Sequence, residues 1–221
     1  LPLCGKTVLE IMLDRLSRFR KQIIIATTND GTEQPIVDLC EQLSINYYRG
    51  DTDNVLSRYY EAAIYYEAKE EDTIVRLTSD CPVIDQNILE KMLVFYENNK
   101  YDYVSNTILR TYPRGLDAEI FSFKALKKSY NNAMTKFEIE HVTTYIHTTH
   151  KEEFQIGSYT DKKDNSKYRL TLDEEDDYLA IKELYSKFNC RTDFTYTELL
   201  KTLYNNAYIY EINAGIEQKK L

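Results

Sequence analysis

Short apolar runs alternate with amphipathic stretches along the first half of the chain. Residues 22–30 and 72–80 each join a β-branched apolar run to a polar end, which predicts buried strands. Segments between such runs carry apolar side chains at helical spacing. In this half we predict strands at 22–30, 45–51, 72–80 and 101–107, and helices at 1–19, 33–44, 54–69 and 86–99. This alternation predicts an α/β fold in which helices cover both faces of a mostly parallel sheet.

The pattern changes after residue 107. A loop leads into further predicted strands at 118–123, 153–161 and 166–172, the last two expected to be antiparallel, and helices at 124–134, 138–150, 173–188 and 196–206. No internal repeat or low-complexity linker divides the chain. We therefore predict one domain over residues 1–221, in which 107–160 form an inserted arm for acceptor binding or dimerisation.

Composition narrows the function classes. Hydrophobic residues make up 43% of the 221 residues and charged residues 29%, as in soluble globular proteins. The net charge of -8 argues against broad nucleic-acid or membrane binding, although a few placed arginines can still bind a small anion. Because the chain shows neither a membrane-length apolar run nor a signal peptide, we expect a cytoplasmic protein. Its cysteines, Cys4, Cys40, Cys81 and Cys190, form no C-x-x-C pair and are expected to be reduced.

Polar clusters follow three of the predicted strands, at 27–30, 49–51 and 78–80. In open α/β sheets ligands bind beyond the carboxyl ends of the strands, so these clusters should line one crevice. Asp80 stands out as a lone carboxylate at a strand end, the hard oxygen ligand that Mg²⁺ prefers. The alternative is an aspartate that only caps a turn.

Asp173 lies between a predicted strand and a predicted helix. It suits the helix N-cap, with Asp176 three residues on as in a capping box, but such a residue can also direct a free oxygen at a cation. Asp85 precedes another helix and is predicted to be an N-cap only.

Several arginines are candidates for neutralising phosphates, and the alternative for each is a surface ion pair. Arg76 lies inside an apolar strand, where its charge requires a partner. The candidates are Arg49, Arg58, Arg76, Arg110 and Arg114.

The loop "RTYPRGLDAE" (110–119) carries two arginines and a glycine ahead of Asp117 and Glu119, which share a strand face if the strand has begun. It either clasps an anionic or polyhydroxy substrate or is an ordinary surface loop. Motifs of other classes, G-x-S-x-G, the P-loop and G-x-G-x-x-G, are missing from the sequence, which gives little support to a hydrolase or a dinucleotide-binding enzyme.

Eight motifs in order resemble the cytidylyltransferase family of spore-coat polysaccharide biosynthesis, which is related to the 3-deoxy-manno-octulosonate and acylneuraminate cytidylyltransferases. Their run extends to about residue 185 and is specific only as a set. The motifs are "PLCGKTVLE", "ATTND", "RGDTDNVLSRYYEAA", "VRLTSDCPVID", "YDYVSNT", "RTYPRGLDAEIFS", "EIEHVT" and "YRLTLDEEDDY".

The resemblance implies a Rossmann-like nucleotidyltransferase fold of three layers, a homodimer, and CTP bound with Mg²⁺ at the strand carboxyl ends. It makes Asp80 and Asp173 the metal ligands and catalytic carboxylates, with Arg76 expected to assist. Nucleotide-side positions are Lys6, Thr28, Asn29, Asp30, Arg49, Arg58 and Ser79. Acceptor-side positions are Arg114, Gly115, Asp117, Glu119, Glu140 and His141.

Members of this family open with a strand and a basic glycine-rich loop ahead of "PLCGK". Both are missing before Leu1, and Lys6 does not replace them. We therefore expect the central strand and the main triphosphate loop either to lie outside this sequence or to be absent, in which case the chain should not catalyse by itself.

The resulting hypothesis is Mg²⁺-dependent transfer of CMP from CTP to a sugar-like acceptor with release of pyrophosphate, in surface or spore-coat polysaccharide synthesis. Two alternatives remain open. One is a glycosyltransferase of related fold that uses a nucleotide sugar and binds metal through "DTD" at 51–53. The other is a nucleotide-binding module without catalysis.

Overall fold

The computed structural model describes residues 1–217 as an α/β protein. Within that range no helix is both long enough and apolar enough to traverse a lipid bilayer. The strands are β1 (Pro2–Leu3), β2 (Lys6–Thr7), β3 (Ile24–Thr27), β4 (Asn46–Arg49), β5 (Thr73–Arg76), β6 (Tyr103–Ser105), β7 (Glu119–Ser122) and β8 (Ile156–Ser158). The α-helices are α1 (Val8–Arg15), α2 (Gln34–Leu43), α3 (Val55–Tyr65), α4 (Gln86–Asn99), α5 (Phe123–Asn132), α6 (Lys136–His141), α7 (Glu175–Lys187), α8 (Tyr196–Asn205) and α9 (Tyr208–Asn213). Shorter helical turns are η1 (Ser17–Gln22), η2 (Tyr145–Thr149) and η3 (Lys151–Glu153).

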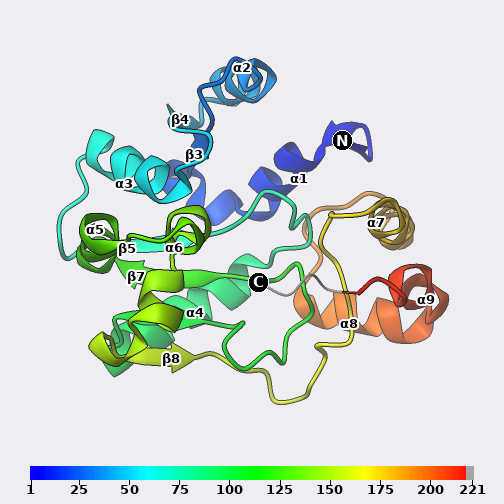
Figure 1. Ribbon diagram of the computed structural model, residues 1–221. Helices are drawn as coiled ribbons and strands as arrows, with labels where there is room; N and C mark the ends of the chain where they lie inside the picture. The colour runs from blue at the N-terminus through cyan, green and yellow to red at the C-terminus, as the bar shows by residue number, and fades with distance from the viewer. Residues whose placement is uncertain (218–221) are drawn as a thin grey trace.

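The strands form the antiparallel β1–β2 hairpin, a small parallel pair and a larger mixed sheet (Figure 1). Strands β3 and β4 run parallel, with Thr27 opposite Arg49. The larger sheet has the order β5-β7-β6-β8. Strand β7 is antiparallel to both of its neighbours, whereas β6 and β8 are parallel. The predicted α/β class is therefore confirmed, and β7 supplies the antiparallel element within it.

Alternating side chains of the sheet separate two apolar cores. Val104 and Ile120 point into the core that α1, α4, α7 and α8 cover. Their neighbours Tyr103 and Phe121 point the other way, into the core under α3 and α5. Since successive side chains of a strand face opposite sides, these few residues are enough to build a three-layer arrangement.

A cavity of about 600 Å³ lies between β3 and β5. Residues of both strands line it, together with apolar residues of α1, among them Met12 and Leu13, and Ala62 and Ala63 of α3. Among the described residues, β3 pairs only with β4 and β5 only with β7, so each leaves one edge open toward the cavity.

Several local predictions were wrong. Residues 1–7, predicted as the start of a helix, form the β1–β2 hairpin, and the helix begins at Val8. Strand β8, predicted to be antiparallel, pairs in parallel with β6. Residues 166–172 form no strand, and their only bridge joins Arg169 to Arg114. The predicted helix 138–150 breaks at Val142, whose φ is 61°. Helix α7 is capped by Glu174, whose capping box uses Asp177, so the predicted N-cap Asp173 lies one residue upstream of the observed N-cap.

The expectation that all cysteines are reduced was also wrong. Cys4 and Cys190 form a disulfide that joins the β1–β2 hairpin to the loop after α7. Cys40 and Cys81 are free and buried. Sequence spacing gave no sign of this pair, because its members lie 186 residues apart and meet only through the fold.

Candidate active site

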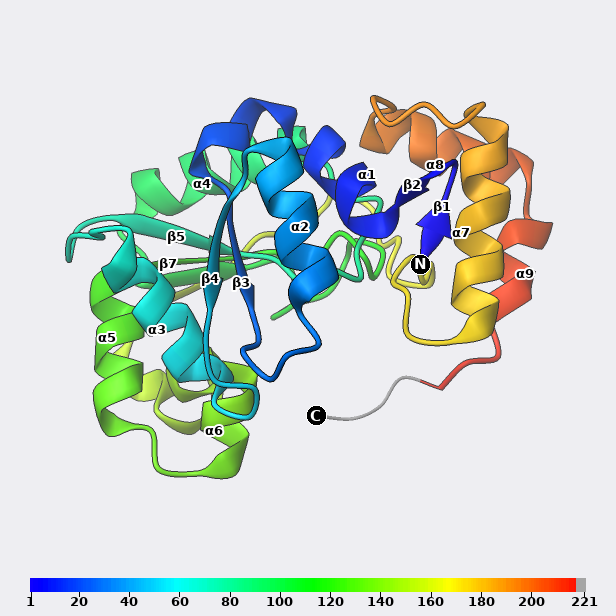
Figure 2. The ribbon, with the colours of Figure 1, turned by 90° about the horizontal axis from the view of Figure 1, so that it is seen from above.

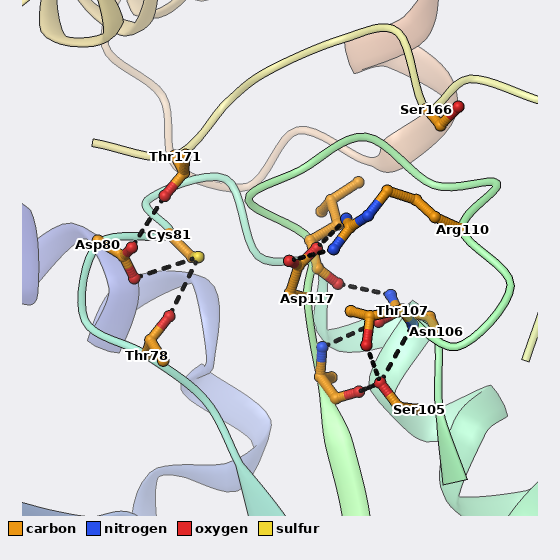
Figure 3. Close-up of polar contacts among 12 residues, drawn as sticks. Thr78, Asp80, Cys81, Ser105, Asn106, Thr107, Arg110, Asp117, Ser166 and Thr171 are labelled. Atoms are coloured by element: carbon orange, nitrogen blue, oxygen red, sulfur yellow. Dashed lines mark hydrogen bonds and ion pairs between the residues drawn. The ribbon is translucent and has the colours of Figure 1, made fainter. Parts of the chain in front are cut away.

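Asp80 lies in the loop that follows β5, at the predicted carboxyl end of a strand (Figure 3). Its Oδ2 accepts a hydrogen bond of 2.9 Å from the hydroxyl of Thr171. Among the described residues, its Oδ1 has as hydrogen-bond donor only the Cys81 thiol, which lies 3.5 Å away and is a weak donor. Burial raises the pKa of Cys81 well above its ordinary value, so this neighbour is a neutral thiol.

The loop after Asp80 is clamped from two helices. Tyr185 of α7 donates its hydroxyl to the carbonyl of Pro82 at 2.7 Å. The guanidinium of Arg15, in α1, donates to Ile84 at 2.7 Å and to Val83 at 3.2 Å. Asp85 caps α4 as predicted, by accepting from the first backbone N–H groups of the helix. These contacts hold the backbone on which the Asp80 carboxylate sits.

An open cavity of about 470 Å³ borders this loop. Its lining joins Thr78, Ser79 and Asp80 to Leu172 and to the N-terminal residues Leu1 and Val8. The 78–80 cluster, and with it Ser79, therefore faces a space that can hold a ligand.

The segment before α7 brings Asp173 next to this cavity, one residue beyond Leu172. The Asp173 carboxylate is 41% exposed and its Oδ2 lies 2.7 Å from Arg169. Arg169 also pairs with Asp177, whose side chain is completely buried. Burial alone would raise the pKa of Asp177, but hydrogen bonds from Arg169, Asn213 and two backbone N–H groups lower it below its ordinary value. The Asp177 charge thus anchors the backbone that presents Asp173.

The donor chemistry at this place fits a divalent cation. Among residues 1–217, Asp80 and Asp173 each have one oxygen held by a protein donor and one oxygen without a strong donor. Asp80 lines the solvent-accessible cavity, and Asp173 directly follows Leu172, which also lines it. Carboxylates are the ligand type that Mg²⁺ takes together with waters and phosphates.

Arg110 and Asp117 form a two-pronged ion pair, with distances of 2.7 and 2.8 Å. Asn106 fixes the chain around Asp117 by donating to Leu116 at 2.7 Å and accepting from the Ala118 N–H at 3.0 Å (Figure 3). Asp117 is also close enough to Cys81 to help raise the pKa of that thiol. The "RTYPRGLDAE" loop therefore lies beside the Asp80 loop.

Arg114 is half-buried between these groups. Burial and the neighbouring Arg110 lower its pKa. Among the residues described, none forms a hydrogen bond or ion pair with its guanidinium, which leaves it available for an anion.

Gly115 has a conformational role that the structure explains. Its φ is +93°, and an added Cβ would lie 2.2 Å from the carbonyl oxygen of Leu170. The 113–115 turn thus packs directly on the segment that carries Thr171, through the bridge between Arg114 and Arg169. Glycine is required here for the close approach of two backbones.

Glu119 and Arg76 are engaged with each other inside the protein. Glu119 accepts from Arg76, Tyr103 and Thr143, the Tyr103 bond being 2.6 Å. Burial would raise the pKa of Glu119, and these partners lower it instead. The structure provides the partner that Arg76 was expected to need. It does not bring either side chain to the Asp80 carboxylate through a contact among the described residues.

The nucleotide-side candidates gather on the loops after β3 and β4. Gly50 donates its N–H to the carbonyl of Thr27 at 3.0 Å, which joins the two loops. Asp30 accepts from Thr52 across them at 3.0 Å, and Thr28 and Asn29 lie beside it in the same loop. Hydrogen bonds from Thr32 and Thr52 lower the pKa of Asp30. The 27–30 and 49–51 clusters therefore meet, as the strand-end argument predicted.

The other basic candidates have partners within the protein. Arg49 contacts Gln34 and Glu33, and Arg58 donates to the carbonyl of Asp51. Lys6 pairs with Asp14 at 2.6 Å on the surface. These pairs leave a phosphate role for each of the three a prediction.

Glu140 and His141 end helix α6. Glu140 is exposed, and the His141 ring lies against Phe137. Among residues 1–217, neither side chain hydrogen-bonds to a residue of the Asp80 loop, and their acceptor-side role stays a prediction.

Thr171 and Asn106 are the residues of this region that sequence reasoning missed. In "YRLTLD", Arg169, Thr171 and Asp173 alternate, so an extended chain places them on one face. That spacing was the available signal for Thr171. Asn106 follows a strand as many ordinary loop residues do, and nothing in the sequence marked it.

Comparison with known proteins gives one consistent result. A family model described as cytidylyltransferase matches residues 1–215. An uncharacterized protein of Methanocaldococcus jannaschii is 35% identical over 226 aligned residues, which cover 99% of this chain and 88% of that protein. The spore coat polysaccharide biosynthesis protein SpsF of Bacillus subtilis is 29% identical, over 93% of this chain and 86% of SpsF.

Solved structures agree. A cytidylyltransferase from Leptospira borgpetersenii has a TM-score of 0.90 and 31% identity, and the match covers 100% of this chain and 91% of that one. A 4-diphosphocytidyl-2C-methyl-D-erythritol synthase from Anaerococcus prevotii has a TM-score of 0.58 at 14% identity, covering 84% of this chain and 92% of the other, and shares the fold.

Proposed function

Because this chain belongs to the cytidylyltransferase family, we propose that it transfers CMP from CTP to a hydroxyl of a sugar or sugar-like acceptor, with Mg²⁺ bound. The acceptor oxygen forms a bond to the α-phosphorus while the bond from that phosphorus to the oxygen bridging to the β-phosphorus breaks. Pyrophosphate leaves with the electron pair, and the hydroxyl proton passes to solvent.

The observation that carries this proposal is the Asp80 carboxylate at the strand end, facing the cavity beside the Asp173 segment. Asp80 and Asp173 would hold the cation, which neutralises phosphate oxygens that gain charge in the transition state. In phosphoryl-type transfer the protein mostly positions reactants and stabilises charge, so a small set of fixed side chains is sufficient.

Side chains of the loop at 110–119, which lies beside the Asp80 loop, are suited to bind the acceptor. The Arg114 guanidinium and the Arg110–Asp117 pair offer donors and acceptors for a polyhydroxy or anionic molecule. On the nucleotide side, Thr28, Asn29 and Asp30 would contact the base and ribose of CTP. The name of SpsF supports a role in polysaccharide synthesis. We also propose a homodimer formed through residues 107–160 and a cytoplasmic location.

The "DTD" sequence at 51–53 does not favour a glycosyltransferase. Asp51 accepts from the backbone of Asp53 and Asn54 at 2.8 and 2.7 Å, so its carboxylate is engaged by the turn that leads to Asn54, the N-cap of α3. Its hydrogen bonds satisfy the local backbone, as turn aspartates commonly do.

The test is pyrophosphate release by the purified protein with Mg²⁺, one nucleotide at a time, and a panel of sugar acceptors. We expect release with CTP that requires both the metal and an acceptor. Turnover of a nucleotide sugar in place of CTP would identify a glycosyltransferase, and CTP binding without release under any acceptor would identify a binding module. Either result contradicts the proposal.

A further inference from the structure

The hydroxyl of Thr171 connects the segment that carries Asp173 to the loop that carries Asp80. Thr171 lies 91 residues from Asp80 in the chain, and its Oγ1 donates to Asp80 Oδ2 at 2.9 Å. The residue is 7% exposed, so water competes little for this bond. Figure 3 shows the hydroxyl directed at the Asp80 carboxylate from the loop that carries Thr171.

The bond leaves the two carboxylate oxygens unequal. Oδ2 is occupied by a hydroxyl donor, whereas Oδ1 has only the neutral Cys81 thiol at 3.5 Å. A carboxylate fixed through one oxygen keeps a defined rotamer, and its other oxygen can then bind a cation without a further loss of side-chain entropy.

The backbone on each side of Thr171 is itself fixed. Leu170 donates its N–H to the carbonyl of Arg114 at 2.9 Å. On the other side, Asp173 donates its N–H to the buried carboxylate of Asp177. A β-branched side chain on a fixed backbone has few χ1 rotamers, so the hydroxyl position is determined by the fold.

We infer that Thr171 is the positioning residue that orients the Asp80 carboxylate for a divalent cation; this rests on the proposed function of Asp80. Partners that hydrogen-bond a metal ligand typically change metal affinity 10- to 100-fold when they are removed. Thr171 therefore acts through Asp80 and needs no contact with CTP or the acceptor.

The experiment measures Mn²⁺ binding to the purified protein by electron paramagnetic resonance, without acceptor and without turnover. Thr171→Val keeps the shape of the side chain and removes the donor, and we expect it to weaken Mn²⁺ binding about 10- to 100-fold. Thr171→Ser restores the hydroxyl and should return affinity to within about threefold of wild type. Ser129→Ala is the matched control, because it removes a buried hydroxyl that donates within α5.

Two outcomes would overturn the inference, and they are distinguishable. Wild-type Mn²⁺ affinity in Thr171→Val, while Asp80→Asn loses binding, removes the role of Thr171 and leaves the proposed function intact. Unchanged affinity in Asp80→Asn contradicts the metal site itself. If Thr171→Val does not fold, as thermal unfolding would show, Thr171→Ala and Thr171→Ser give the same comparison, because Ala also removes the hydroxyl and Ser keeps it.

Kinetics offers a second readout once an acceptor is known. Thr171→Val should raise the Mg²⁺ concentration needed for half-maximal rate and leave KM for the acceptor unchanged. A change confined to the acceptor KM would contradict positioning through the metal ligand.

Discussion

The charged residues of this protein obtain their partners from distant parts of the chain. Asp80 could be placed at a strand end from sequence because a polar residue ended a β-branched run. Its donor Thr171 could not, because the pairing depends on how the loop before α7 folds back. Arg76 was expected to need a partner, and the structure identified Glu119 across the β5–β7 ladder. The sequence thus identified the candidate site residues, whereas their hydrogen-bond and ion-pair partners became known only from the tertiary structure.

Glu138 gives a residue-scale prediction. It accepts from Thr149 at 2.6 Å and from the backbone of Met134 and Thr135 at 3.0 Å. Burial acts to raise its pKa, but these hydrogen bonds lower it from 4.5 to about 2. Because the folded-state pKa is depressed, the stabilisation is present above pH 4.5 and is lost as pH falls toward 2. We expect Glu138→Gln to lower the free energy of unfolding by about 1–3 kcal/mol at pH 7.

Urea unfolding at pH 7 and at pH 3 measures this effect. The gap between wild type and Glu138→Gln should be smaller at pH 3, whereas the exposed Glu71→Gln should differ little from wild type at both. An equal gap at both pH values would show that the Glu138 charge does not contribute.

At the level of elements, the close packing of two loops decides the shape of the site. Most strands and helices were predictable because their apolar spacing is regular. The structure of segment 166–172 was not predictable from its alternating pattern. The segment forms one β-bridge to Arg114 and polar contacts, and no continuous β-ladder. The antiparallel direction of β7 could also not be predicted from the sequence, since hydrophobic periodicity carries no information on strand orientation.

Substitutions at Gly115 and Gly31 distinguish the cost of backbone strain from the cost of a steric clash. Both have a φ of +93°, but an added Cβ meets the Leu170 carbonyl at 2.2 Å in Gly115 and nothing within 4 Å in Gly31. We expect Gly31→Ala to destabilise the protein by about 1–2 kcal/mol, the cost of a left-handed residue. Gly115→Ala should cost about 3–5 kcal/mol, because overpacking is added. Chemical denaturation of both variants checks this, and equal losses would mean that the two loops are not in contact.

At the scale of the whole molecule, the Rossmann-like α/β fold class could be predicted from the sequence and is confirmed. The covalent link between the N-terminal hairpin and the C-terminal part of the chain could not be predicted. In Figure 2 the N-terminal hairpin lies beside α7, where the Cys4–Cys190 disulfide ties them. Sequence could suggest neither this disulfide nor the cavity between β3 and β5, because both are made by segments far apart in the chain.

Reduction of the disulfide should destabilise the protein. A cross-link between residues 186 positions apart restricts the unfolded chain strongly, and its loss should cost about 2–5 kcal/mol. Thermal unfolding with and without reductant measures this. The Cys4→Ala/Cys190→Ala variant is the control and should melt at the reduced wild-type temperature in both buffers. An unfolding temperature of the wild-type protein that is the same with and without reductant would contradict the prediction.

The most direct test of the proposed catalytic site compares Mg²⁺-dependent pyrophosphate release from CTP by wild type, Asp80→Asn, Asp173→Asn and the control Asp164→Asn, an exposed loop residue. We predict that each of the first two substitutions lowers the rate about 10²- to 10³-fold, a loss typical for charge stabilisation in a transition state, and that the control keeps the wild-type rate. Full activity in Asp80→Asn would contradict the metal-binding role on which the proposed mechanism depends.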